Sequence, residues 1–559
     1  MKWFTNGSFT AFLLSNLLVS AVKVPAHHLY NTHEIQDELV ENFREPKNIM
    51  FASSFGGSSH ATWVLSILDE LYHRGHNITY VSTNLHAKFA KPYPYFNTVV
   101  LEKERSVLGK SVDGKHVPIG DIIEELLDYA NQEFGNDYAT FKNIMVNRSM
   151  DIAICDYGAA SGCSEAAKDT KTPYIVTAAF GMISDASAPY INNNVLSMRE
   201  PTTINMTLME RFNDRIITPI KLAIKMGPKV KQIIRQYREA GCSVDKLELD
   251  PSAHQNALKL INSLYGIEAA RPMGPLVELV GPIVPRKYNP LTPELKTFLD
   301  THKRVLYIAF GQHASSTSKD LEMILIAIME SIEAGAYDGF LWASRDLNDR
   351  FPKKIMTQSG RIYNVADMFA GLQPNAHFIQ WAPQTAVVMH PSVSVFLTHG
   401  GAGSLYEALY AGKRLIVFPF FADQFPNAKN VEHNQIGGFL NPENTQEEAN
   451  ELLQRIGYDV DGTYQKNANR YKALVQIHSK HGIIRAADLV EEVLFVNKDG
   501  LLPYRYEVSR QMSFIKAHNI DIYALAAFIV LAPIVLFGVI MKKLFFKKTT
   551  SLIDKQKLN

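Results

Sequence analysis

The sequence predicts an α/β protein built from two doubly wound parallel sheets, one in each half of the chain. Short apolar runs alternate with helical stretches in both halves, which is the pattern of parallel strands covered on both faces. Polar and glycine residues follow several of these runs directly, where open α/β sheets bind ligands. A length of 559 residues is too great for one hydrophobic core and suits about two to four domains.

The first domain is expected at residues 46–270. An amphipathic helix is predicted up to about Arg74, after a glycine- and serine-rich turn that ends at His60. Residues 189–249 are helical in pattern but irregular at their edges, and they are the least predictable part of the chain. The strands of this domain are predicted at 48–55, 78–82, 151–155 and 175–179.

Proline and glycine cluster in residues 271–293, which marks a linker. The second domain is expected at residues 294–500. Its strands are predicted at 305–310, 340–343, 376–381, 393–398 and 415–419, and its last helices at 446–456, 463–480 and 483–496.

The composition excludes several classes of protein. A hydrophobic content of 46% with 20% charged residues is ordinary for a globular protein, and a net charge of +1 gives no reason to expect nucleic-acid binding. Three cysteines, Cys155, Cys163 and Cys242, are too few for a disulfide framework or a zinc site. A bridge between Cys155 and Cys163 is possible, but the sequence favours two buried free thiols.

Both ends of the chain are typical of a membrane-anchored protein. Residues 1–21 combine Lys2 with a following apolar run, which indicates a signal peptide. Residues 520–541 include an uncharged run of about 20 residues, enough to cross about 30 Å of hydrocarbon as a helix. The lysines of the tail, residues 542–559, are expected to keep it in the cytosol, so we expect a single-pass type I protein with a lumenal body.

Short motifs agree with this topology. The final residues, Lys555 to Asn559, resemble the dilysine retrieval signal of endoplasmic-reticulum membrane proteins, so we expect this membrane as the location. Three N-glycosylation sequons fall in the predicted lumenal part, at Asn77, Asn147 and Asn205.

The most informative stretch runs from Phe378 to Phe425. His399 and a glycine-rich turn follow the strand at 393–398 and open a helix, so that backbone amides and the positive end of the helix dipole can meet an anion. Asp423 and Gln424 follow the next strand. The segment therefore predicts a site for a phosphate-bearing ligand with polar groups beyond the phosphates.

This stretch resembles the nucleotide-sugar signature of the UDP-glycosyltransferases, the family of the animal glucuronosyltransferases and the plant secondary-product glucosyltransferases. The resemblance rests on WAPQ at Trp381–Gln384, THGG at Thr398–Gly401, Glu407, and FADQ at Phe421–Gln424. It implies the GT-B fold, with two Rossmann-like domains that face a cleft and a terminal helix that returns to the first domain.

The resemblance also implies a role for each position of the segment. Trp381 would stack on uracil, and Gln384 with Glu407 would bind the ribose. His399, Ser404 and nearby amides would hold the diphosphate, and Asp423 with Gln424 would hold the sugar hydroxyls. The donor-binding positions implied in this way are Trp381, Ala382, Gln384, His399, Gly401, Gly403, Ser404, Glu407, Asp423 and Gln424.

Simpler interpretations exist for two of these features, and two positions depart from the family pattern. Trp381 could be an ordinary buried tryptophan. Ser404 and Glu407 fit the S-x-x-E capping box, in which the glutamate folds back onto the helix terminus. Gly403 stands where an asparagine usually contacts phosphate, and Gln312 stands where relatives commonly have serine.

His60 and Asp156 are the predicted catalytic pair. Each follows a strand of the first sheet. A histidine is suited to accept a proton at neutral pH, and a carboxylate can orient its ring and stabilise the imidazolium. The resemblance assigns the same roles to this pair. A histidine that merely satisfies a helix terminus is the alternative interpretation of His60.

The expected function is that of an inverting O-glycosyltransferase, which moves a hexose from a UDP-sugar to a hydroxyl of a small lipophilic acceptor such as a phenol, flavonoid or sterol. UDP-glucose is the favoured donor, and UDP-glucuronate is the alternative. A non-catalytic GT-B scaffold is a second alternative, against which the presence of both His60 and Asp156 argues. No metal is expected, because amides and His399 can stabilise the diphosphate and Asp459–Asp461 is interpreted as a helix boundary.

Overall fold

The computed structural model describes residues 45–54, 57–102, 119–181, 203, 206–244, 246–247, 250, 253–267, 269–270, 273–284, 286–312, 316–345, 347–421 and 423–556. The predicted signal peptide and the sequon at Asn205 lie outside the described residues. Asn77 and Asn147 are both exposed.

The first sheet has seven parallel strands in the described part of the chain, in the order β3-β2-β1-β4-β5-β6-β7. The central strands are buried on both faces, which explains why their sequences are continuous apolar runs. The chain reverses its direction of winding between β1 and β4, which makes this the switch point of the sheet. The strands are β1 (Asn48–Ala52), β2 (Asn77–Ser82), β3 (Asn97–Val100), β4 (Ile152–Asp156), β5 (Tyr174–Ala178), β6 (Leu258–Ile261) and β7 (Val277–Leu279).

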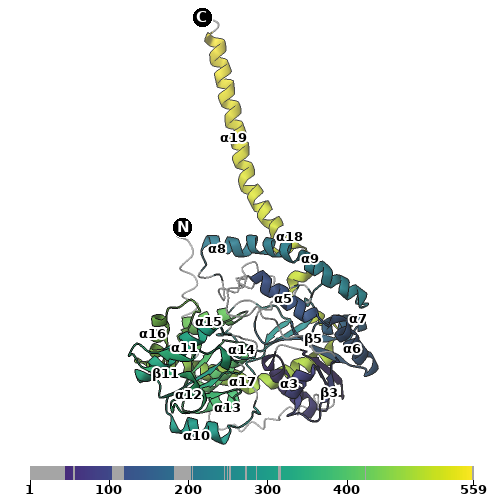
Figure 1. Cartoon of the computed structure of the whole chain (residues 1–559). Coiled ribbons are helices and arrows are strands. Elements are labelled where there is room, and N and C mark those ends of the chain that lie inside the picture. The colour runs from purple at the N-terminus through teal and green to yellow at the C-terminus, as the bar shows by residue number, and fades with distance from the viewer. Residues whose placement is uncertain are drawn as a thin grey trace, which may run out of the picture. The chain divides into compact units, whose positions relative to one another are not determined.

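Helices follow the strands of this sheet. The helix after β1 buries Trp63, Leu65 and Leu68 in the hydrophobic core. The helices are α3 (Ser58–His73), α4 (Asn84–Ala87), α5 (Ile119–Asn131), α6 (Phe134–Asn147), α7 (Cys163–Thr170), α8 (Leu208–Phe212) and α9 (Thr218–Glu239), with a π-helical turn (Asn213–Ile217) between the last two (Figure 1).

The second sheet has six parallel strands in the described residues, in the order β12-β9-β8-β13-β14-β15. Its switch point lies between β8 and β13. A small antiparallel pair, β10 with β11, stands apart from it. The strands are β8 (Val305–Ala309), β9 (Gly339–Ala343), β10 (Lys354–Met356), β11 (Ile362–Asn364), β12 (Ala376–Ile379), β13 (Val393–Thr398), β14 (Arg414–Val417) and β15 (Gly437–Phe439).

Helices also lie between the strands of the second half. The helix α16 (Gln446–Tyr458) ends at Asp459, which has a left-handed conformation and accepts bonds from the backbone amides of Tyr464 and Gln465. The predicted helix boundary at Asp459–Asp461 is therefore confirmed. The helices are α10 (Pro293–Thr301), α11 (Ser318–Glu333), α12 (Val365–Phe369), α13 (Gln384–Met389), α14 (Ala402–Ala411), α15 (Gln424–His433), α16 (Gln446–Tyr458), α17 (Thr463–Val496), α18 (Phe514–Ala517) and α19 (Ile520–Gln556).

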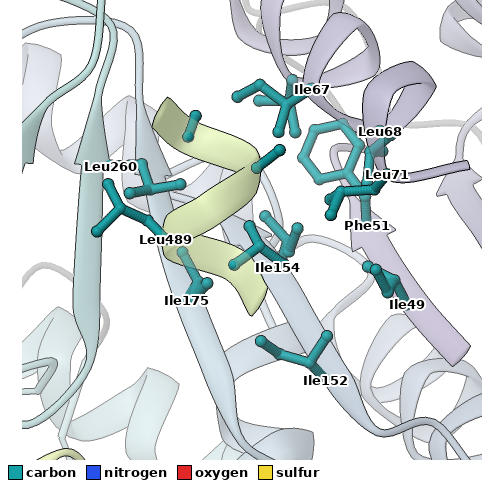
Figure 2. Packing of buried hydrophobic residues seen from close by; sticks show 14 of the residues in the cluster. Ile49, Phe51, Ile67, Leu68, Leu71, Ile152, Ile154, Ile175, Leu260 and Leu489 are labelled. Atoms are coloured by element: carbon teal, nitrogen blue, oxygen red, sulfur yellow. The ribbon is translucent and has the colours of Figure 1, made fainter. Parts of the chain in front are cut away.

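The long helix α17 corrects the prediction of two helices at 463–480 and 483–496. Gly482 does not break it. A Cβ at Gly482 would lie 2.4 Å from the carbonyl oxygen of Val280, so glycine is needed there for close packing against the linker. Beyond this point α17 enters the core of the first domain, where Figure 2 shows Leu489 beside Leu260 and Ile175.

The boundary of the linker also differs from the prediction. Strand β7 lies inside residues 271–293 and pairs with β6, so this part belongs to the first sheet. The passage between the two sheets therefore begins after Leu279 and ends at Thr292, the N-cap of α10.

The expectation of two free thiols is wrong, because Cys155 and Cys163 form a disulfide with Cα atoms 5.8 Å apart. Between them the chain turns tightly, with positive φ at Gly158 and Gly162, and this brings the start of α7 back against β4. Cys242 is the free cysteine and is buried.

Helix α19 is the one described helix that is long and apolar enough to cross a membrane (Figure 1). Its apolar part is Ile520–Leu544, with a mean hydropathy of 2.8 and none of the apolar window buried. It contains the segment predicted at 520–541.

Candidate active site

A cavity of about 420 Å³ is lined by residues that follow the switch points of both sheets. His60 lines it from the first domain. The predicted donor-binding residues line it from the second domain, including Trp381, His399, Glu407 and Asp423. The structure therefore brings together the two groups of residues that the sequence singled out separately.

His60 and Asp156 are in direct contact. The Nδ1 atom of His60 lies 2.9 Å from Oδ2 of Asp156, which also accepts a hydrogen bond of 3.0 Å from the Ser53 hydroxyl. The contact arises because β1 and β4 are neighbours: Asp156 is the last residue of β4, and His60 lies in the first turn of α3, which follows β1. The Asp156 side chain is fully buried, whereas 19% of the His60 side chain is exposed.

The surroundings of His60 raise its pKa. Burial of the imidazole acts to lower the pKa, but the charge of Asp156, the hydrogen bond to it, and the charge of Asp423 act in the opposite direction and prevail. Since Asp423 belongs to the second domain, the two halves of the site are electrostatically coupled. An ionised Asp156 can only accept, so Nδ1 of the neutral imidazole donates to it and Nε2 is left to accept a proton.

His399 occupies a space that two glycines leave open. A Cβ at Gly311 would lie 2.8 Å from the imidazole, and one at Gly401 would lie 2.4 Å from its Nε2 atom. Gly401 is also the N-cap of α14, and the first amides of a helix have no partners within it. An imidazole and a helix N-terminus thus stand together at the switch point, an arrangement suited to a phosphate.

Gln384, Ser404 and Glu407 form one polar network. The amide nitrogen of Gln384 donates to Ser404 at 3.0 Å and to Glu407 at 2.6 Å, and Thr385 donates to the other oxygen of Glu407. The capping-box interpretation is wrong, because Gly401 is the N-cap and no side chain caps this helix. Burial raises the pKa of Glu407, although the bonds from Gln384 and Thr385 oppose this.

Asp423 and Gln424 each use part of the side chain in hydrogen bonds within the protein. The side-chain oxygen of Gln424 accepts from the amides of Phe420 and Phe421, which leaves its amide nitrogen as the group that could meet a sugar hydroxyl. Asp423 accepts a bond of 3.0 Å from Asn427 and lies at the N-terminus of α15.

Trp381 is 59% exposed while it lines the cavity, which rules out the interpretation as an ordinary buried tryptophan. The adjacent Ala382 is buried. Gln312 and Gly403 line the same cavity. A Cβ at Gly403 would lie 3.1 Å from the Cβ of Ser59, so a larger residue would press on the first domain.

Two cavity-lining cations were not singled out by the sequence analysis. Arg345 follows β9 and donates to the carbonyl oxygen of Gly311 at 3.1 Å. Lys287 comes from the passage between the sheets and lies 3.6 Å from Asp69. Arg345 lies two positions after the apolar strand β9, and this position was the available signal. Nothing in the local sequence marks Lys287.

Comparison with known proteins places the chain in a family. The model of the UDP-glucoronosyl and UDP-glucosyl transferases matches residues 190–557. The chain belongs to this family. UDP-glycosyltransferase stmC of Aspergillus ustus is 25% identical over 521 residues, which cover 87% of this chain and 96% of that relative.

A second UDP-glycosyltransferase is more similar to this chain, but over a shorter stretch. UDP-glycosyltransferase 1 of Phaeomoniella chlamydospora is 33% identical over 292 residues, which are 50% of this chain and 58% of that relative. The crystal structure of the glycotransferase of kitacinnamycin matches with a TM-score of 0.57 and 18% identity, over 80% of this chain and 99% of the other. This likeness shows the fold, so the predicted GT-B architecture is confirmed.

The raised pKa of His60 can be tested with diethyl pyrocarbonate, which modifies only neutral imidazole. The rate of His60 modification, followed by mass spectrometry, should rise with pH about a midpoint above the ordinary value of 6.5. In Asp156→Asn the midpoint should move to lower pH, because the imidazolium loses its carboxylate partner. His73, whose side chain is 65% exposed, is the control and should not respond to the substitution. An unchanged His60 midpoint would contradict the coupling.

Proposed function

We propose that this protein is an inverting O-glycosyltransferase that transfers glucose from UDP-glucose to a hydroxyl of a small lipophilic acceptor. One observation carries the proposal. The His60–Asp156 pair and the donor-binding residues of the second domain line the same cavity, with Asp423 close enough to raise the pKa of His60. A base and a sugar-binding carboxylate from opposite domains are thus within reach of one reacting centre.

The reaction is a single displacement. Nε2 of His60 takes the proton of the acceptor hydroxyl, and the acceptor oxygen forms a bond to the anomeric carbon of the sugar. The bond between that carbon and the β-phosphate oxygen breaks, and its electron pair leaves with UDP. Attack from the face opposite the leaving group inverts the configuration.

The residues of this chain supply the electrostatics of that step. Asp156 stabilises the imidazolium that forms on His60. The amides at the start of α14, His399 and the Ser404 hydroxyl meet the charge that develops on the diphosphate. These donors suit the diphosphate, so we propose that no metal ion is needed.

The cavity favours a neutral sugar over glucuronate. A glucuronate carboxylate at the sugar end would approach the carboxylate of Asp423, which is unfavourable. A glucuronate carboxylate would need a cation beside it, and the described residues that line the cavity offer Arg345 and Lys287. Arg345 donates to the carbonyl oxygen of Gly311, and Lys287 lies beside Asp69. These contacts do not direct either cation toward Asp423.

The first domain offers an apolar surface for the acceptor. Trp63 and Phe180 of the first domain line the cavity, together with Ile283 and Val284 of the passage between the sheets. Apolar walls with a single base suit a flat, lipophilic molecule that carries one reactive hydroxyl. Phenols, flavonoids and sterols have this character.

Donor recognition can be tested by calorimetry on the full chain. Trp381→Ala should weaken UDP binding by about 1–3 kcal/mol, the scale of one stack between a base and an aromatic ring. Tyr265→Ala, a substitution at another exposed aromatic residue that does not line the cavity, is the control and should leave the affinity unchanged. In turnover assays of the wild type, UDP-glucose should be used faster than UDP-glucuronate. Equal UDP affinity in a folded Trp381→Ala protein would contradict the stacking, and faster use of UDP-glucuronate would overturn the donor assignment.

The base can be tested with acceptors of different acidity. His60→Ala should lower turnover by about two to four orders of magnitude while UDP affinity stays nearly unchanged. The double variant with Asp156→Ala should be little slower than His60→Ala alone, because the two residues act as a unit. The loss should be larger for an aliphatic alcohol than for a phenol, which gives up its proton more readily. Wild-type transfer to an alcohol by His60→Ala would exclude this mechanism.

We also propose that the catalytic body lies in the lumen of the endoplasmic reticulum and that α19 anchors it. The apolar part of α19 followed by lysines supports this orientation, and so does the disulfide between Cys155 and Cys163.

The orientation can be tested in sealed microsomes. Protease added outside should remove only the tail that follows Met541, and the body should become sensitive after detergent is added. Digestion of the body in sealed microsomes would place it on the cytosolic side.

A further inference from the structure

The segment from α8 to α9 carries an apolar stripe that faces solvent. Of the residues from Leu208 to Lys225, all of them described, only Asp214 is buried. The apolar side chains of this stripe are between 46% and 76% exposed, and they recur every four residues at Leu208, Phe212, Ile216, Ile220 and Ile224. Single exposed apolar residues are normal, but an aligned series of five is not.

The helical geometry keeps these five side chains together. Residues four apart in an α-helix are displaced by only about 40° around the axis. The turn Asn213–Ile217 is π-helical and wound less tightly, which reduces the displacement further. The stripe is therefore a continuous feature of one side of the segment.

Basic side chains flank the stripe on both sides. Arg211 and Arg215 each precede a stripe residue by one position, whereas Lys221 and Lys225 each follow one. All four are exposed. An apolar face bordered by lysine and arginine is the pattern of a helix that lies in the interface of a membrane, because the charged ends remain among the head groups while the apolar side chains enter the acyl layer.

The chain itself brings a bilayer near this segment. Arg505 donates to Pro275 and Glu278 of the first domain at 2.7 and 2.9 Å, and Arg510 donates to Gln255. The residues from Arg510 to Ile520 can span at most about 35 Å. The start of the predicted membrane helix is thus tied to the domain that carries α9. Phe514 and Ile515, 71% and 53% exposed, add apolar side chains just before it.

We infer that the α8–α9 segment is a second membrane contact, which lies flat on the bilayer that α19 crosses, with the stripe in the acyl boundary and the four cations among anionic head groups. The remainder of α9 packs on the first domain, where Ile233 and Tyr237 are buried, so the contact would fix the orientation of that domain on the membrane. The inference rests on α19 as the anchor and does not depend on the proposed donor or acceptor.

The test uses the full chain in lipid nanodiscs, with Cys242→Ala as the background. A fluorophore that responds to polarity is attached at Ile220→Cys. The matched control is Met356→Cys on β10 of the second domain, since Met356 is also exposed, at 63%. Ile220 should show a blue-shifted emission and several-fold stronger quenching by spin-labelled lipids than the control, and both effects should be larger with phosphatidylserine than with phosphatidylcholine alone.

Two further variants identify what holds the segment. Leu208→Ser with Ile216→Ser and Ile224→Ser should abolish the quenching at position 220 while the anchor keeps the protein in the disc and UDP affinity is unchanged. Arg211→Gln with Arg215→Gln, Lys221→Gln and Lys225→Gln should remove the preference for phosphatidylserine. Quenching at Ile220 no stronger than at Met356 would overturn the inference. A shift that appears only in discs with two copies of the chain would also overturn it, because it would assign the stripe to a dimer interface.

Discussion

The two sheets can act on one pair of substrates only if their carboxyl ends are held toward the same cavity, and α17 supplies this constraint. It begins beside the second sheet and ends in the core of the first domain, where Leu489 and Val490 are buried. Arg74, the C-cap of α3, binds Asp488 and Glu491 at 2.7 and 2.6 Å. The Arg74 side chain is only 8% exposed and also binds Glu70 of α3 at 2.9 Å, so one largely buried cation joins carboxylates of both helices.

The sequence was sufficient to predict the strands and helices whose local residue pattern agrees with their burial in the fold. Strand β13 was predicted with its observed bounds, because both faces are buried and its residues are mostly apolar or β-branched, with Ser394 as the exception. Strand β3 was missed because it is a short edge strand whose residues are largely exposed, with only Val99 and Val100 as apolar positions. Strand β6 was missed because Lys259 interrupts its apolar run, although this lysine is buried and donates to the carbonyl oxygen of Ala257. Two helices were predicted at 463–480 and 483–496, whereas α17 runs through residues 481–482, where Gly482 packs against Val280.

In the candidate site, too, the residues with a local sequence signal were predicted and those that depend on distant partners were not. The cavity contains every donor-binding position that the sequence proposed, and His60 with it, because strand ends and glycine turns leave local signatures. The partners of Glu407 could not be predicted in this way. A serine three positions earlier on the same helix matched a capping motif, whereas the actual partners, Gln384 and Thr385, come from another helix. Lys287 had no signature at all, since it reaches the cavity from a proline-rich passage that has no regular structure.

The disulfide closes a covalent ring of a few residues, and Asp156 is a member of that ring. The carboxylate that orients His60 therefore sits beside a chemical cross-link, and its place depends less on the entropy of a free loop than it would with two thiols. Such a bond persists only where the surroundings are oxidising. The geometry of the His60–Asp156 pair is thus linked to the compartment in which the chain matures. In a reducing cytosol the same sequence would hold these side chains on a loop without the cross-link.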